Sequence, residues 1–494
     1  MRPTDSGESF RSAALLPEHT RVRAQAQLDR FGAEIGRRLR TLADSSDADM
    51  KRLASLARRY GLDPRRDLGL AGPDAVLARV PASRDLTAGE RERGLHVLLS
   101  GGCVHEIFAA GEASRMREAL RRHGKDVTDR EAGAMYFLDL GHLAGEPYSL
   151  AWGPRQLLQL RREIERRAAA HREAGFTPEE AVRRQQIVLH VNVRMESEIA
   201  RDLADHRFYG FSAERFTFVP QPVWPPFRLE EGVVTAAADL PPVPFGHLHP
   251  TMQVLVEEGA GWRLEGGRRT KVPGVLAEDL MARGGEVLQQ RRINDLTKLS
   301  PDTADPDWLA FALRLLDRGH HYLVELVENP GRPDPRDPGL RVYQKGGLPF
   351  EVRAGVSDDL NRKLLSETIS ASDPETQEMV DQEIRRRGGF PYNKFSGVLR
   401  LKEARRVLDR RGADVNLEAK TARGADGVEV RYLNPQYVTG DVTHDPELNA
   451  AFFMVEGEEI HDFKDVSNLE EAVGFVRRQD ADPELRALLR EHLG

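Results

Sequence analysis

One segment of the sequence combines small residues with an arginine in a way that suits phosphate binding. The apolar run 104–110 predicts a strand that leads into small residues, and a helix is expected to follow. Side chains as small as Ala110, Gly111 and Ser114 let a backbone approach a ligand closely, and a helix N-terminus attracts anions. Arg115 adds donors that match phosphate oxygens. The plainer interpretation is an ordinary strand-to-helix turn with a surface arginine.

Two later segments carry polar side chains in proline-rich loops. Gln221 follows an apolar run and can pair with the edge of a base, although the plainer role of such a glutamine is to satisfy backbone groups. His247 and His249 have the i, i+2 spacing of metal-binding histidines in cupin barrels. A cupin also needs a glutamate about four residues on, where Val254 and Leu255 stand instead. We therefore interpret His247 as a ligand contact and His249 as structural.

Asp295 lies at the expected end of a strand, in the run Arg-Ile-Asn-Asp-Leu. Mg²⁺ prefers one or two carboxylates together with substrate phosphates, so a single aspartate there is enough for a metal site. The alternative interpretation is an aspartate that caps the next turn.

Lysine is scarce in this chain, with ten against a large excess of arginine. Lys345 beside Gly346-Gly347 and Lys464 in a mixed loop are therefore more informative than lysines usually are. Asn393, which follows Gly388-Gly389 and lies among aromatic residues, suits contacts to sugar hydroxyls. The alternative there is a simple bend between a helix and a strand.

The segments that must position these residues differ along the chain in their pattern of apolar and charged residues. The stretch 18–91 has apolar residues at three- and four-residue steps, which predicts helices. From residue 94 onward short apolar runs alternate with longer charged segments of helical period. The apolar runs are 104–110, 187–193, 216–219 and 322–327, and the helical segments are 155–170, 197–205 and 308–316. This alternation predicts an α/β fold with a mainly parallel mixed sheet flanked by helices.

Length and composition limit the number of domains and the class of protein. The 494 residues suggest two or three domains, and we divide them into an N-terminal helical region 1–93, a core 94–469 and a C-terminal helical tail 470–494. The net charge of −7, from 72 basic and 79 acidic residues, is too mild for a nucleic-acid binder. Cys103 is the single cysteine, and no signal peptide or membrane-length apolar run is visible. We expect a cytoplasmic protein of enzyme size.

Taken in order, these segments resemble the UDP-sugar pyrophosphorylase family, which includes the UTP–glucose-1-phosphate and UDP-N-acetylhexosamine enzymes. That family has a Rossmann-like nucleotide-diphospho-sugar transferase fold of GT-A type. Segment 109–116 resembles its glycine-rich nucleotide loop, 187–221 its strand–helix–strand run, and 244–247 its Pro-x-Gly-His loop. The likeness continues through a Lys-Gly-Gly segment and an Asn-containing strand to the late Lys-x-x-Ser-x-Leu element at 463–469. It spans about residues 94 to 469.

The resemblance implies a set of site residues and a cofactor. Uracil is expected at Ala110, Gly111, Ser114, Gln221 and Gly246, the triphosphate at Arg115 and Lys464, the sugar phosphate at His247, Lys345 and Asn393, and Mg²⁺ at Asp295. Three departures from the family pattern stand out. Glu112 replaces a small or neutral residue, Asn294-Asp295 reverses the usual order, and Lys125 is the nearest substitute for an early lysine. The chain also ends soon after Leu469, without the C-terminal β-helix of glucose-type members.

The resemblance further implies nucleotidyl transfer. An oxygen of a sugar 1-phosphate attacks the α-phosphorus of UTP and expels pyrophosphate, and the protein supplies alignment and positive charge. The substrates are small molecules, with neither nucleic acid nor membrane as a partner. Two alternatives are a non-catalytic relative that binds nucleotide sugars, suggested by Glu112, and nucleotidyl transfer to a non-sugar phosphate or phosphonate.

Overall fold

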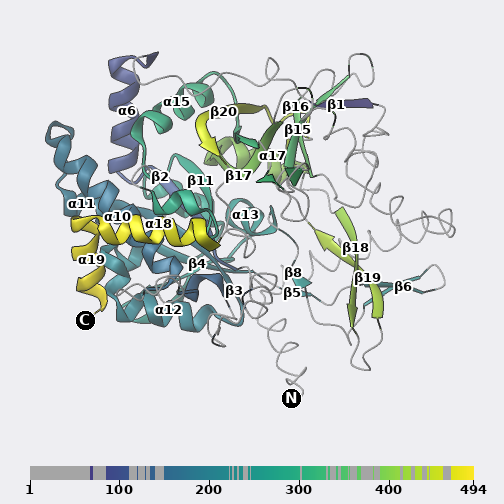
Figure 1. The fold of residues 1–494 in the computed structure, drawn as a ribbon, viewed down its shortest axis with the longest axis horizontal. Helices are drawn as coiled ribbons and strands as arrows, with labels where there is room; N and C mark the ends of the chain where they lie inside the picture. Colours follow the sequence, from purple (N-terminus) through teal and green to yellow (C-terminus); the bar gives the residue numbers. More distant parts are fainter. Residues whose placement is uncertain are drawn as a thin grey trace.

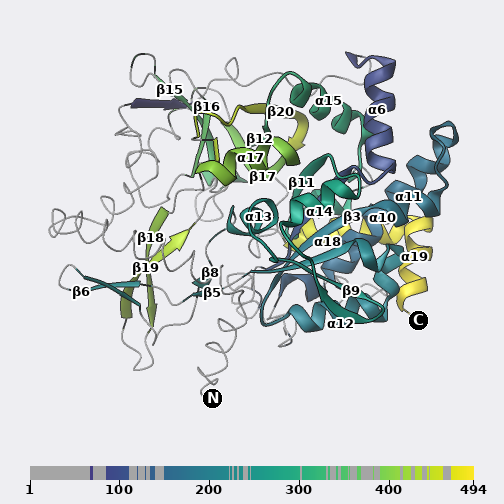
Figure 2. The same cartoon turned by 180° about the vertical axis from the view of Figure 1, so that it is seen from behind.

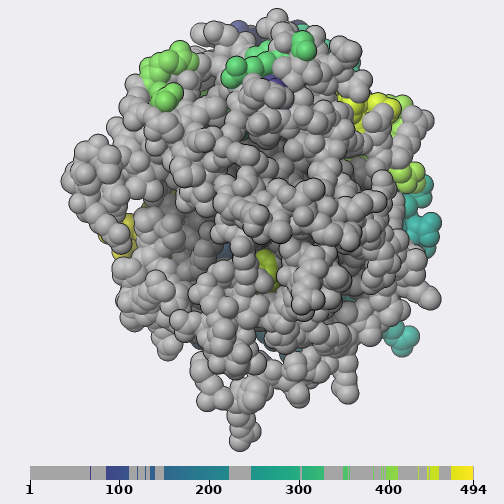
Figure 3. Space-filling model, turned by 90° about the vertical axis from the view of Figure 1, so that its right-hand side faces the viewer, coloured from purple at the N-terminus to yellow at the C-terminus, as the bar shows by residue number. Residues whose placement is uncertain are grey.

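The structure is a computed structural model of the chain. The coloured atoms of Figure 3 belong to the residues that it describes. These are residues 67–70, 85–110, 120, 128, 134–139, 150–221, 223–224, 227–230, 233–236, 243–244, 246, 248–300, 303–329, 332–333, 341–342, 347–353, 355, 364–368, 382, 386, 390–411, 416–423, 429–436, 442–443, 445–459 and 469–493. No helix within these ranges is both long and apolar enough to cross a membrane.

A twelve-stranded mixed sheet forms the centre of the fold (Figure 1). Its middle consists of four parallel strands in the order β11 (Val287–Arg292), β2 (Cys103–Phe108), β3 (Gln186–Asn192) and β4 (Phe216–Gln221). All seven residues of β3 are buried, as expected for a parallel strand covered on both faces.

Antiparallel strands extend this middle on both sides. Beyond β11 come β17 (Phe390–Arg400), β15 (Gly347–Val352) and β1 (Leu68–Leu70), and beyond β4 come β9 (Trp262–Glu265) and β10 (Arg268–Lys271). Strand β12 (Tyr322–Asn329) pairs with β17 and, in parallel, with β20 (Ala450–Glu459), while β16 (Leu364–Thr368) pairs with β15. The sheet is therefore parallel at its centre and mixed at its margins.

Two layers of helices cover the two faces of the sheet. The first layer, toward the viewer in Figure 1, contains α6 (Ala88–Leu99), α10 (Trp152–Ala170), α11 (Pro178–Arg184), α12 (Glu196–Asp205), α15 (Pro306–Asp317), α18 (Leu469–Ala481) and α19 (Pro483–Leu493). The second layer, toward the viewer in Figure 2, contains α13 (Leu248–Leu255), α14 (Leu276–Ala282) and α17 (Leu401–Arg411). Alternate residues of the strands serve the two cores: Leu189 packs into the first and Val188 into the second.

Smaller elements complete the fold. A separate four-stranded sheet has the order β18 (Asn416–Arg423), β19 (Glu429–Gln436), β6 (Phe227–Glu230) and β7 (Val233–Ala236), and it lies at the right of Figure 1. Two small antiparallel sheets of two strands each pair β5 (Val223–Trp224) with β8 (Val243–Pro244) and β13 (Arg332–Pro333) with β14 (Arg341–Val342).

Side-chain caps define where two of the first-layer helices begin. Thr87 caps α6: its Oγ1 accepts from the N–H of Glu90 at 3.2 Å, and the Glu90 carboxylate accepts from the N–H of Thr87 at 2.7 Å. Thr177 and Glu180 form the same box at the start of α11, where Pro178 occupies the first turn. Each box satisfies two N–H groups that lack a partner inside the helix.

The α/β prediction is confirmed, and most elements lie near their expected positions. The apolar runs became β2, β3, β4 and β12, and the three helical segments became α10, α12 and α15. The tail predicted at 470–494 is helical in α18 and α19. Two features differ. Helix α6 runs across the expected boundary at residue 94, and β1, inside the region expected to be helical, is a strand of the main sheet. The other residues of 1–93 lie outside the described residues, except 67 and 85–87.

His105 in β2 predicts a pH dependence of stability. The residue is fully buried, and its Nε2 lies 3.2 Å from Oε1 of Gln185. Burial, and next the positive charge of Arg291, hold the pKa of His105 well below its usual 6.5. The unfolded chain therefore binds a proton near pH 6.5 that the folded chain does not bind, so stability present above that pH is lost as the pH falls below it.

We expect the free energy of unfolding to fall less steeply between pH 7 and 5 in His105→Gln than in the parent protein. The difference in slope is at most about 1.4 kcal/mol per pH unit, which corresponds to one proton. Urea unfolding of both proteins at several pH values measures it. Equal slopes would show that His105 titrates alike in the folded and unfolded chain.

Candidate functional site

The carboxyl ends of the parallel strands meet at one edge of the sheet. β2 ends at Phe108, which lies beside His190 of β3, and the chain continues into Ala109 and the buried Ala110. The last residue of β3, Asn192, lies beside Gln221, the last residue of β4. In open α/β sheets, ligands bind in the crevice beyond the carboxyl ends of the strands. This edge is therefore the candidate active site.

Gln221 and Gly246, two residues predicted to bind the nucleotide, are in direct contact. The Nε2 of Gln221 donates to the carbonyl oxygen of Gly246 at 3.0 Å. Gly246 has a φ of +85°, in the left-handed region that favours glycine, so the loop takes a sharp turn there. Gln221 therefore has at least the plainer of its two predicted roles, which is to fix a backbone carbonyl. Its contact with a base stays a prediction.

Asn393 and the glycine-rich segment after Lys345 also come together. In the sheet, Asn393 of β17 is paired with Gly347, the first residue of β15, and its side chain is buried. Because β17 runs antiparallel to β11, Asn393 near its start lies toward the carboxyl edge of the parallel strands. Asn393 therefore lies on the side of the sheet where Gln221 ends β4.

Asp295 follows β11 and starts the short 3₁₀ helix η6 (Leu296–Leu299). Its Oδ1 accepts from the N–H of Thr297 at 3.0 Å and from Oγ1 of Thr297 at 2.6 Å, and its Oδ2 lies 3.7 Å from Nζ of Lys298. The residue is 4% exposed. A carboxylate that is buried, caps a helix and faces an ammonium group does not fit a magnesium ligand.

No group of three His, Cys, Asp or Glu side chains within the described ranges is arranged to hold a metal ion. Six predicted site residues lie outside those ranges, so their positions stay predictions: Gly111, Ser114, Arg115, His247, Lys345 and Lys464. Glu112 and Lys125 lie outside them as well. His249, expected to be structural, is buried in α13 with its Nε2 3.4 Å from Oε1 of Glu257.

A buried chain of hydrogen bonds runs beneath the candidate site. Glu106 of β2 accepts from Nε2 of His190 at 2.8 Å and, on its other oxygen, from the hydroxyl of Thr251 at 3.2 Å. Thr251 in turn accepts from Nε2 of Gln290 at 3.0 Å, and Gln290 accepts from the hydroxyl of Tyr322 at 3.1 Å. Burial, and next the Glu106 carboxylate, raise the pKa of Tyr322 far above its usual value, so its hydroxyl keeps the proton that it donates.

These hydrogen bonds join β2, β3, α13, β11 and β12 directly behind the strand ends. They tie α13, which follows Gly246, to the strands that carry Phe108 and Asn192. Sequence reasoning did not single out these residues. The available signal was the presence of Glu106 and His190 inside otherwise apolar strands, because buried polar groups need partners.

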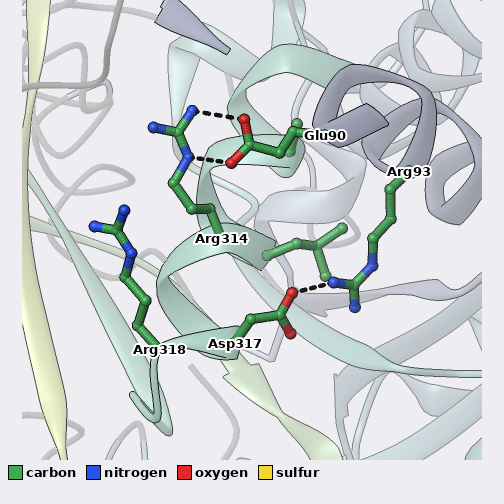
Figure 4. A pocket seen from close by; sticks show the side chains of 7 residues that line it. Glu90, Arg93, Arg314, Asp317 and Arg318 are labelled. Carbon is green, nitrogen blue, oxygen red and sulfur yellow. Dashed lines mark hydrogen bonds and ion pairs between the residues drawn. The ribbon is translucent and has the colours of Figure 1, made fainter. Parts of the chain in front are cut away.

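Two cavities lie beside α6 rather than at the strand ends. The smaller, of about 270 Å³, lies between α6 and α15 (Figure 4). In it Glu90 pairs with Arg314 at 2.7 Å, and Arg93 pairs with Asp317. Arg93 also pairs at 2.6 Å with Glu286, directly before β11, which places it at the amino edge of the parallel strands. The larger cavity, of about 790 Å³, is lined by α6, the turn after α10 and the start of α15. Neither cavity is the candidate active site.

Solved structures match this chain, although no protein-family model and no curated protein sequence does. A UDP-N-acetylglucosamine pyrophosphorylase from Trypanosoma brucei, in complex with an inhibitor, has a TM-score of 0.54 and 15% identity, over 79% of this chain and 68% of that one. A candidate UDP-N-acetylglucosamine pyrophosphorylase from Entamoeba histolytica has a TM-score of 0.54 and 13% identity, over 82% and 88%. A point mutant of UDP-glucose pyrophosphorylase from Leishmania major, in complex with UDP-glucose, has a TM-score of 0.51 and 14% identity, over 88% and 77%.

The sheet order, the two helical layers and the polar residues at the carboxyl edge define an α/β protein with a nucleotide-diphospho-sugar transferase fold. Within that class, the chain has the fold of the UDP-sugar pyrophosphorylases, as the ordered motifs predicted. At identities of 13–15% the likeness is one of fold.

Proposed function

We propose that this protein is a nucleotidyltransferase that makes a nucleotide sugar, most simply a UDP-sugar, from UTP and a sugar 1-phosphate with release of pyrophosphate. The observation that carries the proposal is the contact of Gln221 with Gly246 at the carboxyl edge of a sheet with the UDP-sugar pyrophosphorylase fold. Asn393 beside Gly347 adds a second pair of motif residues toward the same edge. We further propose small-molecule substrates and a cytoplasmic location.

The proposed mechanism is alignment and electrostatic stabilisation. Ala110, Gln221 and Gly246 hold the base and ribose, while His247, Lys345 and Asn393 hold the sugar phosphate. The sugar-phosphate oxygen forms a new bond to the α-phosphorus as the bond to the pyrophosphate leaving group breaks. Arg115 and Lys464 stabilise the negative charge on the transferred and leaving phosphates. No covalent intermediate with the protein is required.

A pyrophosphate-release assay with the four nucleoside triphosphates and a panel of sugar 1-phosphates tests the proposal. We expect release that needs both substrates and is greatest with UTP. Release only with non-sugar phosphates or phosphonates as acceptors would favour the alternative reaction, nucleotidyl transfer to a non-sugar acceptor. Nucleotide-sugar binding without release in any combination would overturn catalysis and favour a binding protein.

Gln221→Ala tests the nucleotide contact. Loss of the hydrogen bond to Gly246 removes about 1 kcal/mol of loop stabilisation, so KM for UTP should rise about fivefold. The KM values for UTP and for ATP distinguish the two roles of Gln221. If Gln221 also contacts the base, the preference for UTP over ATP falls in the variant. An equal change in KM for both nucleotides would show that Gln221 fixes the loop and does not contact the base.

Gln253→Ala is the matched control. Its Nε2 donates to the carbonyl oxygen of Pro220 at 3.3 Å, so this glutamine also holds a backbone carbonyl near the end of β4. We expect its loss to leave the preference for UTP over ATP unchanged. A reduced preference in this variant would show that the nucleotide selectivity responds to any loosening of the loop.

A further inference from the structure

Both oxygens of the Asp295 carboxylate face groups inside the protein. One oxygen takes both hydrogen bonds from Thr297, the N–H at 3.0 Å and the hydroxyl at 2.6 Å, and so fills both of its lone-pair directions. The other oxygen lies 3.7 Å from Nζ of Lys298, itself only 9% exposed. Asp295 therefore has two structural roles: it caps η6, and it neutralises the charge of a buried lysine.

Helix α10 fixes the turn that carries Asp295. The indole N–H of Trp152 and the amide of Gln156 both donate to the carbonyl oxygen of Ile293, the latter at 2.5 Å. Gln156 also lies 3.3 Å from the carbonyl oxygen of Asp295. Trp152 and Gln156 are one helical turn apart and both are buried. Hydrogen bonds from α10 therefore anchor the backbone on either side of Asn294.

The same helix holds the C-terminal helices. Arg155, which is 0% exposed, donates to Asp480 of α18 at 3.0 Å and to Gln479 at 3.3 Å. Consecutive residues of α10 therefore bind the Asp295 turn and α18, and η6 lies in contact with both helices. The turn after β11 is a junction between the sheet and the C-terminal helices.

The electrostatic surroundings disfavour a metal ion bound to Asp295. Arg291, at 3% exposure, donates to the neutral oxygens of Gln289 at 2.8 Å and Thr303 at 3.2 Å, and the charges that favour its protonated form include the carboxylates of Asp295 and Glu325. Lys298 adds a second buried cation. A divalent cation at Asp295 would lie within a few ångströms of an ammonium group, where like charges repel strongly because little water screens them.

We propose that Asp295 is a positioning residue, the internal counter-ion of Lys298 and the cap of η6, and that it does not bind the metal. Any Mg²⁺ then arrives as the complex of the nucleoside triphosphate, held by phosphate oxygens and water as this ion prefers. The inference concerns the metal of the proposed nucleotidyl transfer, and it rests on that proposed function only for the identity of the nucleotide.

The first test is direct binding of Mn²⁺, in place of Mg²⁺, to the full-length protein with and without UTP. Asp295→Asn is the informative variant, because asparagine caps a helix as well as aspartate but carries no charge. We expect equal Mn²⁺ affinity, within about twofold, in the parent protein and in Asp295→Asn, and a strong increase in bound Mn²⁺ only when UTP is present. A tenfold or greater loss of Mn²⁺ affinity in Asp295→Asn would overturn the proposal.

The second test is a double-mutant cycle on stability. Asp295→Asn leaves Lys298 without its counter-ion and should lower the midpoint of urea unfolding. Lys298→Met, which removes the cation, should restore most of that loss in the double variant, because removing both partners of a buried pair leaves no uncompensated charge. Additive losses from the two substitutions would show that the pair does not act as a unit and would overturn the proposal.

Neither test depends on turnover. If no substrate pair releases pyrophosphate, the proposed function fails while the stability cycle still decides the role of Asp295. If pyrophosphate is released but Asp295→Asn loses Mn²⁺ affinity, the proposed function stands and this inference fails.

Discussion

Replacing Lys464 by alanine is expected to lower kcat for pyrophosphate release at least about a hundredfold while leaving the fold intact. The proposed reaction concentrates negative charge on the transferred and leaving phosphates, and a fixed ammonium group there supplies several kcal/mol of stabilisation. The measurement is kcat under saturating UTP and sugar 1-phosphate, with circular dichroism and thermal unfolding of the same preparations. Near-normal kcat in Lys464→Ala would exclude Lys464 from the reaction.

Two further variants sharpen this experiment. Lys464→Arg keeps the positive charge and should therefore recover part of the lost rate. The rate would not depend on this charge if Lys464 had a purely structural role. Lys402→Ala is the matched control, because Lys402 is an exposed lysine on α17. We expect its kcat to equal that of the parent protein. An equal loss of rate in Lys402→Ala and Lys464→Ala would point to a general effect of net charge.

The second large effect is expected from Asp480→Ala, on stability. Arg155 is completely buried, and Asp480 is the carboxylate that pairs with it, at 3.0 Å. Removing one partner of a buried ion pair leaves an uncompensated charge, a loss of about 3–5 kcal/mol in the free energy of unfolding. Urea unfolding, followed by the fluorescence of Trp152 and the other tryptophans, measures it. Asp480→Asn keeps a hydrogen-bond acceptor and should lose less.

An ion pair between α10 and α19 in which the acidic partner is exposed provides the control for Asp480→Ala. Glu491 lies 3.9 Å from Arg161, and its side chain is 60% exposed. Exposed pairs contribute little, so Glu491→Ala should change the free energy of unfolding by less than about 1 kcal/mol. If Asp480→Ala is as mild as Glu491→Ala, the Arg155 charge is compensated by other means and α18 is not anchored by this pair.

Local patterns predicted the elements of the core well. The run 187–193 became β3, and 308–316 became most of α15, because β3 is mostly apolar and α15 has a clear helical period. Short elements that depend on distant partners escaped prediction. Strand β1 has three residues, and among the described strands it pairs with β15, some 280 residues later in the chain. No local pattern in so short a strand distinguishes it from a loop.

In the candidate site, too, some features could be predicted from the sequence and others depend on contacts that only the fold creates. The order of the motifs led to Gln221, Gly246 and Asn393, and the structure places Gln221 against Gly246. The position of Asp295 after a strand left a metal ligand and a cap as two interpretations, and only the structure shows the cap and the contacts with Thr297 and Lys298. The buried chain from His190 to Tyr322 joins residues from five elements, and only the assembled fold brings them together.

The order of strands in the sheet also has a consequence for how the chain is made in the cell. Strand β2 ends at Phe108, but one of its two neighbours, β11, begins at Val287, and β17 beyond that begins at Phe390. At about 5–20 residues per second, a ribosome needs roughly 10 to 35 seconds to synthesise the chain between β2 and β11. Throughout that interval the edge of β2 that β11 later covers has no strand partner in the emerging polypeptide. Nascent chains that stall before β11 would therefore present an open, apolar strand edge, and these are the species that most need a chaperone.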